Sequence, residues 1–162
     1  MERFKGLKLI ADRQTPVLDQ HVLARFISEG YLAAHLRRMR LLYSRRRSAL
    51  LEALQSEATG LLHVSDTPEV GLHIVARLRV PIDDRSVSRS LLQQQIYAAP
   101  LSSFYAGATR ERGFALGFAG TPESQIRPAV RHLVKAVDSI LHRGRRTVIG
   151  SSLERPQSQR VF

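Results

Sequence analysis

Apolar side chains recur at helical spacing through the first part of the chain. A first run starts near Leu18 and places the apolar positions from Val22 to Ile27 on one helical face, until Gly30 interrupts it. A longer run then continues to about Gly60. Its apolar residues lie three or four positions apart, or at sums of these steps: Leu32, Leu36, Met39, Tyr43, Leu50 and Leu54. The pattern predicts a helix followed by one long amphipathic helix.

After Gly60 the pattern changes to short extended segments. Leu61–Val64 and Leu72–Leu78 predict two strands, the second with alternating apolar positions. The residues between them have the chemistry of a turn, with Asp66, Thr67, Pro68 and Gly71.

A short helix is predicted next. Asp83 or Asp84 can act as its N-cap, and Val87, Leu91 and Leu92 form the predicted buried side as far as Gln95.

Two more extended segments, Ile96–Leu101 and Phe114–Ala119, precede a closing helix. Thr121 suits the N-cap of that helix and Pro122 its first helical position. Its predicted apolar face consists of Ile126, Val130, Leu133, Val134, Val137 and Leu141.

This order of elements predicts an α/β (α+β) fold in which a small mixed sheet packs against helices. We expect a lead-in segment at residues 1–17, the folded domain at residues 18–142 and a flexible basic tail at residues 143–162.

Composition narrows the function classes. The chain has 162 residues, enough for one domain, and no cysteine, which excludes disulfides and thiolate sites. Its net charge is +11, and all 25 basic residues except Lys5, Lys8 and Lys135 are arginines, so acidic partners are indicated. No apolar stretch has the length of a membrane span and the start lacks a signal-peptide pattern, so we expect no membrane association and a cytoplasmic location.

No local motif specifies an enzyme. The histidines do not have metal-ligand spacing, and the serine-hydrolase elbow and the Walker and Rossmann glycine patterns are absent. The sequence therefore predicts no catalytic, cofactor-binding or metal-ligating residue in this chain.

One stretch has a specific resemblance. The run from Phe26 to Arg40, Phe-Ile-Ser-Glu-Gly-Tyr-Leu-Ala-Ala-His-Leu-Arg-Arg-Met-Arg, followed by Tyr43 and Arg45-Arg46-Arg47, resembles MocR-type regulators of the GntR family. These look like a winged helix-turn-helix fused to a fold-type I aminotransferase domain. The similarity covers residues 9–142 and continues through three further segments: Gly71-Leu72-His73, Pro100-Leu101-Ser102 with Tyr105, and Leu116-Gly117-Phe118-Ala119.

The resemblance implies that the chain is the C-terminal small domain of a fold-type I PLP-dependent aminotransferase-like protein. The family's Schiff-base lysine lies in an upstream Ser-Lys motif that this sequence does not contain, and Lys8 matches an ordinary lead-in position. PLP is thus the implied cofactor, but we expect no covalent binding and no catalysis by this chain alone. The implied partners are a large aminotransferase domain or a homodimer partner, with DNA contacted only through an N-terminal module not present here.

Two positions depart from the family pattern. Ala115 stands where aminotransferases often carry an arginine that grips a carboxylate, and Gln95 stands where the family commonly has glycine. Ser102 and Tyr105 look like the rim of the family's substrate cleft, although ordinary loop packing explains both equally well.

Two alternatives stay open. One is a fragment of a plain class I/II PLP-dependent aminotransferase with no regulatory fusion. The other is a stand-alone basic module that contacts nucleic acid through the arginines between Arg37 and Arg47 and those of the tail.

Overall fold

The computed structural model describes residues 2–12, 16–64, 71–109 and 111–151, and at 2–3, 11–12 and 144–151 the backbone alone. Contacts divide the chain into two units, Met1–Leu42 (unit 1) and Tyr43–Phe162 (unit 2). The domain boundary predicted from the sequence lies after residue 17, and it stays a prediction. The turn predicted at residues 66–68 and the predicted tail from residue 152 onward lie outside the described residues.

Unit 1 is helical. It contains α1 (Glu2–Asp12), α2 (Val17–Ser28) and the first part of α3 (Tyr31–Glu57). The segment predicted as a lead-in therefore includes a helix. The break predicted at Gly30 is confirmed, because this residue separates α2 from α3 at a φ of 81°, a conformation that favours glycine.

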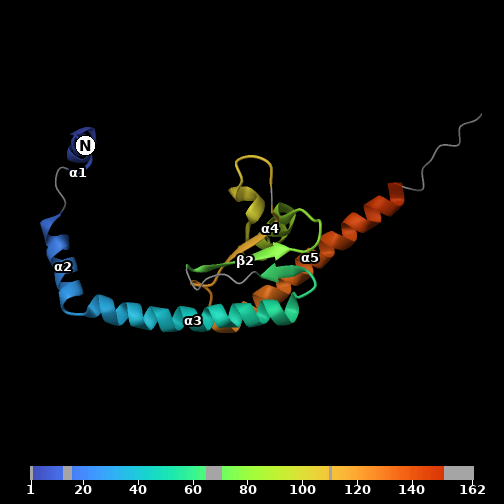
Figure 1. The fold of residues 1–162 in the computed structure, drawn as a ribbon, viewed down its shortest axis with the longest axis horizontal. Coiled ribbons are helices and arrows are strands. Elements are labelled where there is room, and N and C mark those ends of the chain that lie inside the picture. Colours follow the sequence, from blue (N-terminus) through green and yellow to red (C-terminus); the bar gives the residue numbers. More distant parts are fainter. Residues whose placement is uncertain (1, 13–15, 65–70, 110, 152–162) are drawn as a thin grey trace, which may run out of the picture. The chain divides into compact units, whose positions relative to one another are not determined.

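Unit 2 is built on a four-stranded sheet (Figure 1). In the order β1-β2-β4-β3 its strands are Leu62–Val64, His73–Leu78, Gly113–Gly117 and Ala99–Pro100. The predicted class of helices on a small sheet is confirmed, but every pairing is antiparallel and the sheet is not mixed. The reason is that β2 and β3, which run in the same direction on either side of α4 (Asp84–Leu92), are separated by β4.

The core of unit 2 lies on one face of this sheet. Ile74 pairs with Leu116 and Ala76 with Phe114, so alternate positions of β2 and β4 are buried together. The second half of α3 and α5 (Glu123–Ser151) supply much of the remaining core. Six of these residues were predicted on the apolar faces of the two helices, Leu50, Leu54, Ile126, Val130, Leu133 and Val137, and Ala53 joins them.

The two long helices of this core are also joined at the surface. Glu57 of α3 accepts from Arg127 at 3.2 Å and from Arg131 at 3.0 Å on α5. The backbone of α5 continues to Ser151, beyond the start of the tail predicted at residue 143. Residues 143–151 contain no proline that would end the helix, and the one proline within α5 is Pro128.

The start of α4 settles which aspartate acts as the cap. Asp83 is the N-cap and accepts a hydrogen bond from the Ser86 backbone N–H at 3.0 Å. Val87 and Leu91 are buried as predicted, whereas Leu92 is exposed, because it lies a quarter turn away from Leu91 on the helix.

Acid is expected to weaken this cap. The hydrogen bond from the Ser86 hydroxyl to Asp83 holds the pKa of that carboxyl below its ordinary value, against the opposing effect of burial. A lowered folded-state pKa gives stability that is present above the ordinary pKa and is lost as the pH falls through the folded value. Asp83→Asn keeps a capping oxygen without the charge. Urea unfolding should therefore show wild type to be more stable than the variant near pH 7, with the difference shrinking below about pH 4; an unchanged difference would contradict this assignment.

The C-terminus of α4 explains the departure at Gln95. Gln95 N–H donates to Leu92 O at 3.0 Å and Ile96 N–H donates to Leu91 O at 3.0 Å, the two bonds of a Schellman motif. Gln95 has a φ of 60°, the left-handed conformation in which a side chain is unfavourable.

Gln95→Gly should consequently stabilise the protein by about 0.5–1 kcal/mol, because glycine adopts this conformation without a steric cost. The measurement is the urea midpoint, with Gln94→Gly as the control. That change, one residue earlier and without the positive φ, should be neutral or destabilising. Destabilisation by both variants would argue against strain at Gln95.

Candidate functional site

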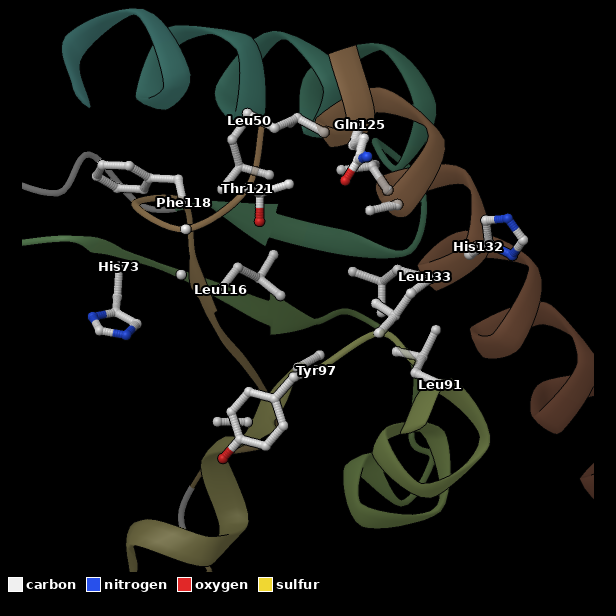
Figure 2. Close-up of a pocket in the computed structure, with 18 of the residues that line it drawn as sticks. Leu50, His73, Leu91, Tyr97, Leu116, Phe118, Thr121, Gln125, His132 and Leu133 are labelled. Carbon is white, nitrogen blue, oxygen red and sulfur yellow. The ribbon is translucent and has the colours of Figure 1, made fainter. Parts of the chain in front are cut away.

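Unit 2 contains an open cavity of about 700 Å³ (Figure 2). Its walls come from α3, the start of β2, the end of α4 with the loop to β3, strand β4, and the first half of α5. Most of the lining is apolar, including Leu50, Leu72, Leu91, Ile96, Leu116, Phe118, Ile126, Val130 and Leu133. A concave site of this size and character lies within the usual range of ligand-binding and docking cavities.

The polar groups of the cavity are few. None of its lining residues is an aspartate, glutamate, lysine or arginine, and the polar members are His73, Gln95, Tyr97, Thr121, Gln125 and His132. Figure 2 shows His73 and His132 on different sides of the cavity, His73 from β2 and His132, with Gln125, from α5. The arrangement therefore suits an apolar group and offers neither a lysine nor an arginine to a phosphate or carboxylate.

Two histidines border the cavity in different settings. His73 is exposed and lies over Gly117, its cross-strand partner, where a methyl group on Gly117 would come within 3.3 Å of the imidazole. His132 is placed by a contact of 2.6 Å between its Nδ1 and Gln94 Oε1. His73 thus has the freer imidazole of the two at the cavity.

Arg46 of α3 holds the turn beside the cavity. Its guanidinium donates to the carbonyl of Ala119, which belongs to the cavity lining. Its Nε is buried and has no hydrogen-bond partner among the residues that the structure describes. Arg46 is thus turned toward the fold, unlike its exposed neighbour Arg45.

The two predicted rim residues lie apart from this cavity. Ser102 is 5% exposed and does not line it; its backbone N–H and its hydroxyl donate to the Asp84 carboxylate at 3.0 and 2.6 Å. Arg85 in turn donates to the Ser102 hydroxyl at 3.0 Å and to its carbonyl at 3.1 Å. Tyr105 is half-buried directly after the short helix η1 (Leu101–Phe104). A role of either residue at a cleft shared with another domain stays a prediction.

The sequence did not predict the cavity itself. Many of its lining residues were predicted as strand or helix core, and an apolar side chain at an open cavity wall has the same pattern as one in a closed core. The signals in the sequence were the two departures from the family pattern, Ala115 in place of an arginine and Gln95 in place of a glycine, and both residues line the cavity.

The described residues do not fit PLP by themselves. Lys5 and Lys8 are exposed on α1, Lys135 is exposed on α5, and none of the three lines the cavity. A phosphate of nearly two negative charges needs several donors or cations, and the cavity has no lysine or arginine among its lining residues. A PLP site would need groups from outside these residues.

Other site types are also missing from the part of the chain that the structure describes. There, no three histidine or acidic residues are close enough to hold a metal ion together. Likewise, no helix in this part combines the length and the apolar character needed to cross a bilayer.

The chain is similar to several transcriptional regulators. It is 33% identical over 120 residues to the probable rhizopine catabolism regulatory protein MocR of Rhizobium meliloti, a match to 74% of this chain and 24% of that protein. It is 31% identical over 117 residues to the HTH-type transcriptional regulator YhdI of Bacillus subtilis, a match to 72% of this chain and 25% of that protein. The chain thus spans about a quarter of the length of these regulators.

Aminotransferases share the same region. Aromatic-amino-acid aminotransferase 1 of Thermococcus litoralis is 25% identical over 130 residues, which is 80% of this chain and 31% of that enzyme. No protein-family model matches the chain.

About a third of each of several solved aminotransferases has the same fold as this chain. The kynurenine aminotransferase of Pyrococcus horikoshii, crystallised with PMP, matches with a TM-score of 0.73 and 26% identity over 85% of this chain and 34% of its own. LysN of Thermus thermophilus, crystallised with N-(5'-phosphopyridoxyl)-L-leucine, matches with a TM-score of 0.71 and 26% identity over 85% of this chain and 35% of its own. The chain is therefore homologous, over about three-quarters of its length, to part of the aminotransferase-like domain that MocR-type regulators share with fold-type I aminotransferases.

Proposed function

We propose that this chain is the C-terminal small-domain part of the effector-sensing, aminotransferase-like domain of a MocR-type transcriptional regulator. The observation that carries the proposal is the 33% identity to Rhizobium meliloti MocR over 74% of this chain, higher than the 25% identity to the Thermococcus litoralis aminotransferase. The regulators MocR and YhdI are 33% and 31% identical to this chain and the aminotransferase is 25% identical, and this difference favours the regulatory branch of a shared fold.

In this proposal PLP is bound by the rest of the domain. PLP bound there supplies an aldehyde and a conjugated ring that react with amines. This chain contributes the apolar cavity and its uncharged polar groups, which can exclude water from one side of an effector cleft and orient a ligand there. In the same proposal, DNA is bound by a module outside these residues. The regulator forms a homodimer and is located in the cytoplasm.

A binding assay tests the proposal. Rhizobium meliloti MocR lacking the quarter that matches this chain serves as the probe, and the purified chain is added to it with PLP. We expect the two polypeptides to co-elute in gel filtration, and PLP to be fixed by borohydride to the MocR part and not to the chain. PLP fixed to Lys5, Lys8 or Lys135 of this chain would overturn the assignment of the cofactor site, and failure to co-elute would count against the proposed assembly.

A plain aminotransferase is the second candidate, and the match to 80% of the chain in the Thermococcus litoralis enzyme favours it. The two candidates differ in the sequence encoded upstream. A helix-turn-helix segment followed by a Ser-Lys motif supports the regulator, whereas a Ser-Lys motif without that segment supports the enzyme.

The nucleic-acid-binding alternative has one observation in its favour. Arg37, Arg38, Arg40 and Arg45 of α3 are exposed, although Arg46 is used within the fold. Direct contact with phosphates would make DNA affinity fall steeply with salt, with a log-log slope of about −0.9 per neutralised phosphate. Absent or salt-independent binding by the purified chain would remove this candidate.

A further inference from the structure

We propose that the cavity of unit 2 selects an effector without a carboxylate: an amine whose other end is an apolar body with a neutral hydroxyl or amide group. The inference rests on the proposed function, in which the effector is an amine that reacts with PLP held outside these residues. It adds the chemical class of that effector, and it assigns the selection to Ala115 and to the edge of β4 at Gly117.

Ala115 leaves the part of the wall that β4 provides without a cation. It lies in the middle of β4, is half-buried and lines the cavity, and it stands where aminotransferases often carry an arginine that grips a carboxylate. A methyl group cannot form the paired hydrogen bonds by which a guanidinium binds a carboxylate. The space of the longer side chain is left to the ligand, in a cavity of about 700 Å³.

Four arginines of the elements around the cavity already have partners within the chain, and none of the four lines the cavity. These pairs are Arg46 with the Ala119 carbonyl, Arg77 with Glu111, and Arg127 and Arg131 with Glu57. A carboxylate that entered the cavity would therefore lose water without gaining a cation from the lining residues that the structure describes. Such a transfer is unfavourable for a charged group.

The edge of β4 offers a different kind of partner. Among the described residues, β3 pairs with Ala115 and Phe114 alone, so it ends before Gly117, which lines the cavity farther along the same edge. The N–H of the next residue, Phe118, donates toward β2, to Leu72 O at 3.2 Å. Successive residues of an antiparallel strand direct their backbone groups to opposite sides. The N–H and C=O of Gly117 therefore face the side on which β3 has ended.

This edge fits a neutral polar group. Gly117 offers one donor and one acceptor, and a hydroxyl or a primary amide can pair with both. An ionised carboxylate is an acceptor only, so it would set a negative oxygen against the Gly117 carbonyl. The apolar lining around this edge, which includes Leu72, Leu116 and Phe118, can bury the body of the ligand. Together these groups select an uncharged end and disfavour that of an amino acid.

The chain alone tests this selection with a matched pair of probes. 3-Phenylpropionamide and 3-phenylpropionate share an apolar body and differ in a neutral amide and a charged carboxylate. In a chain labelled with ¹⁵N-glycine, the NMR signals of Gly117 and Gly120 report on the cavity, and those of Gly60 and Gly107, which do not line it, are internal controls. We expect the amide to shift only the first two signals, with a Kd of about 1 mM for so small a probe. The carboxylate should bind at least about tenfold more weakly.

An added cation should remove the preference. Gln125→Arg places a guanidinium at an exposed position that lines the cavity, and Ser124→Arg adds the same charge one residue away, outside the lining. Gln125→Arg should bind 3-phenylpropionate at least about tenfold more tightly than the wild-type chain does, and Ser124→Arg should match the wild type. Ala115→Arg should act like Gln125→Arg, and the helix-surface variant keeps the test valid where the strand variant does not fold.

The outcomes separate this inference from the proposed function. Equal binding of the two probes by the wild-type chain, or no shift of Gly117 and Gly120 with the amide, overturns the inference and leaves the proposed function standing, because this arm uses neither an amine nor PLP. In the complex with truncated Rhizobium meliloti MocR and PLP, 2-phenylethylamine should raise the unfolding temperature more than L-phenylalanine, which has the same body and a carboxylate. The reverse order also overturns the inference. Failure of the two polypeptides to co-elute counts against the proposed function, and the chain alone then decides the selection.

Discussion

Replacing Gly113 by alanine is expected to destabilise unit 2 by at least about 3 kcal/mol, enough to remove most of the stability of a small domain. Gly113 begins β4 with a φ of 151°, where a side chain is strained. A β-carbon at this position would overlap the carbonyl oxygen of Ala76 and approach the Arg77 Cα to 2.8 Å. Both obstacles are backbone atoms of β2, so no side chain can move aside to relieve them.

Gly117→Ala in the same strand is the matched control. There the new methyl group meets the imidazole of His73 at 3.3 Å, and that exposed side chain can shift, while the nearest backbone atom beyond its chain neighbours, Leu72 O, lies at an ordinary contact distance of 4.0 Å. We expect a change within about 1 kcal/mol at Gly117. Urea unfolding followed by circular dichroism measures both, and similar losses from the two variants would show that the approach of β2 to Gly113 is looser than the structure indicates.

The sequence predicts the helices of this fold better than its sheet. The spacing of Leu50, Leu54, Ile126 and Val130 predicts two amphipathic helices, and these side chains are buried in one core. Helical periodicity is local, so it survives without knowledge of the rest of the fold. Strand direction is not local, and the insertion of β4 between β2 and β3, which makes the sheet antiparallel, has no signal at either strand.

The ends of the strands and the burial of single residues were predicted less well than the helices, because both also depend on parts of the fold that are distant in the sequence. The extended segment predicted at Ile96–Leu101 contains only a two-residue strand, because the Schellman turn at the end of α4 takes up Ile96. Leu92 was predicted in the core and is exposed. The exposed apolar side chains of α2 follow the same helical spacing as the buried ones of α5, so an apolar pattern alone cannot separate core from exposed surface.

The predicted site was informative mainly through its departures. Ala115 and Gln95, both noted as differences from the family pattern, line the cavity. Ala115 stands in place of a charged arginine, and Gln95 has the left-handed backbone conformation that favours glycine. Ser102, predicted as a rim residue, contacts a buried carboxylate, and its place at the rim of a cleft stays a prediction. The pattern of two successive aspartates could not indicate that one caps α4 and the other is fully buried.

Removal of that buried carboxylate is expected to have the second large effect. Asp84 is fully buried and accepts three hydrogen bonds, from the Ser102 hydroxyl at 2.6 Å, the Ser102 N–H at 3.0 Å and the Gly113 N–H at 3.1 Å. These bonds join the start of α4 to η1 and to the first residue of β4. Asp84→Ala would leave the three donors without an acceptor inside the fold, at about 1–3 kcal/mol for each one left unsatisfied.

We therefore expect Asp84→Ala to cost about 3–5 kcal/mol of unfolding free energy in urea, and its neighbour Asp83→Ala only about 1 kcal/mol, the usual loss for a helix N-cap. The two variants change the net charge equally and lie one residue apart, so their difference isolates the buried contacts from the charge and from helix capping. Asp84→Asn should recover only part of the loss, because its amide has one acceptor oxygen and brings two donors into a site that already contains donors. Equal effects of Asp83→Ala and Asp84→Ala would mean that the carboxylate of Asp84 does not join these three elements.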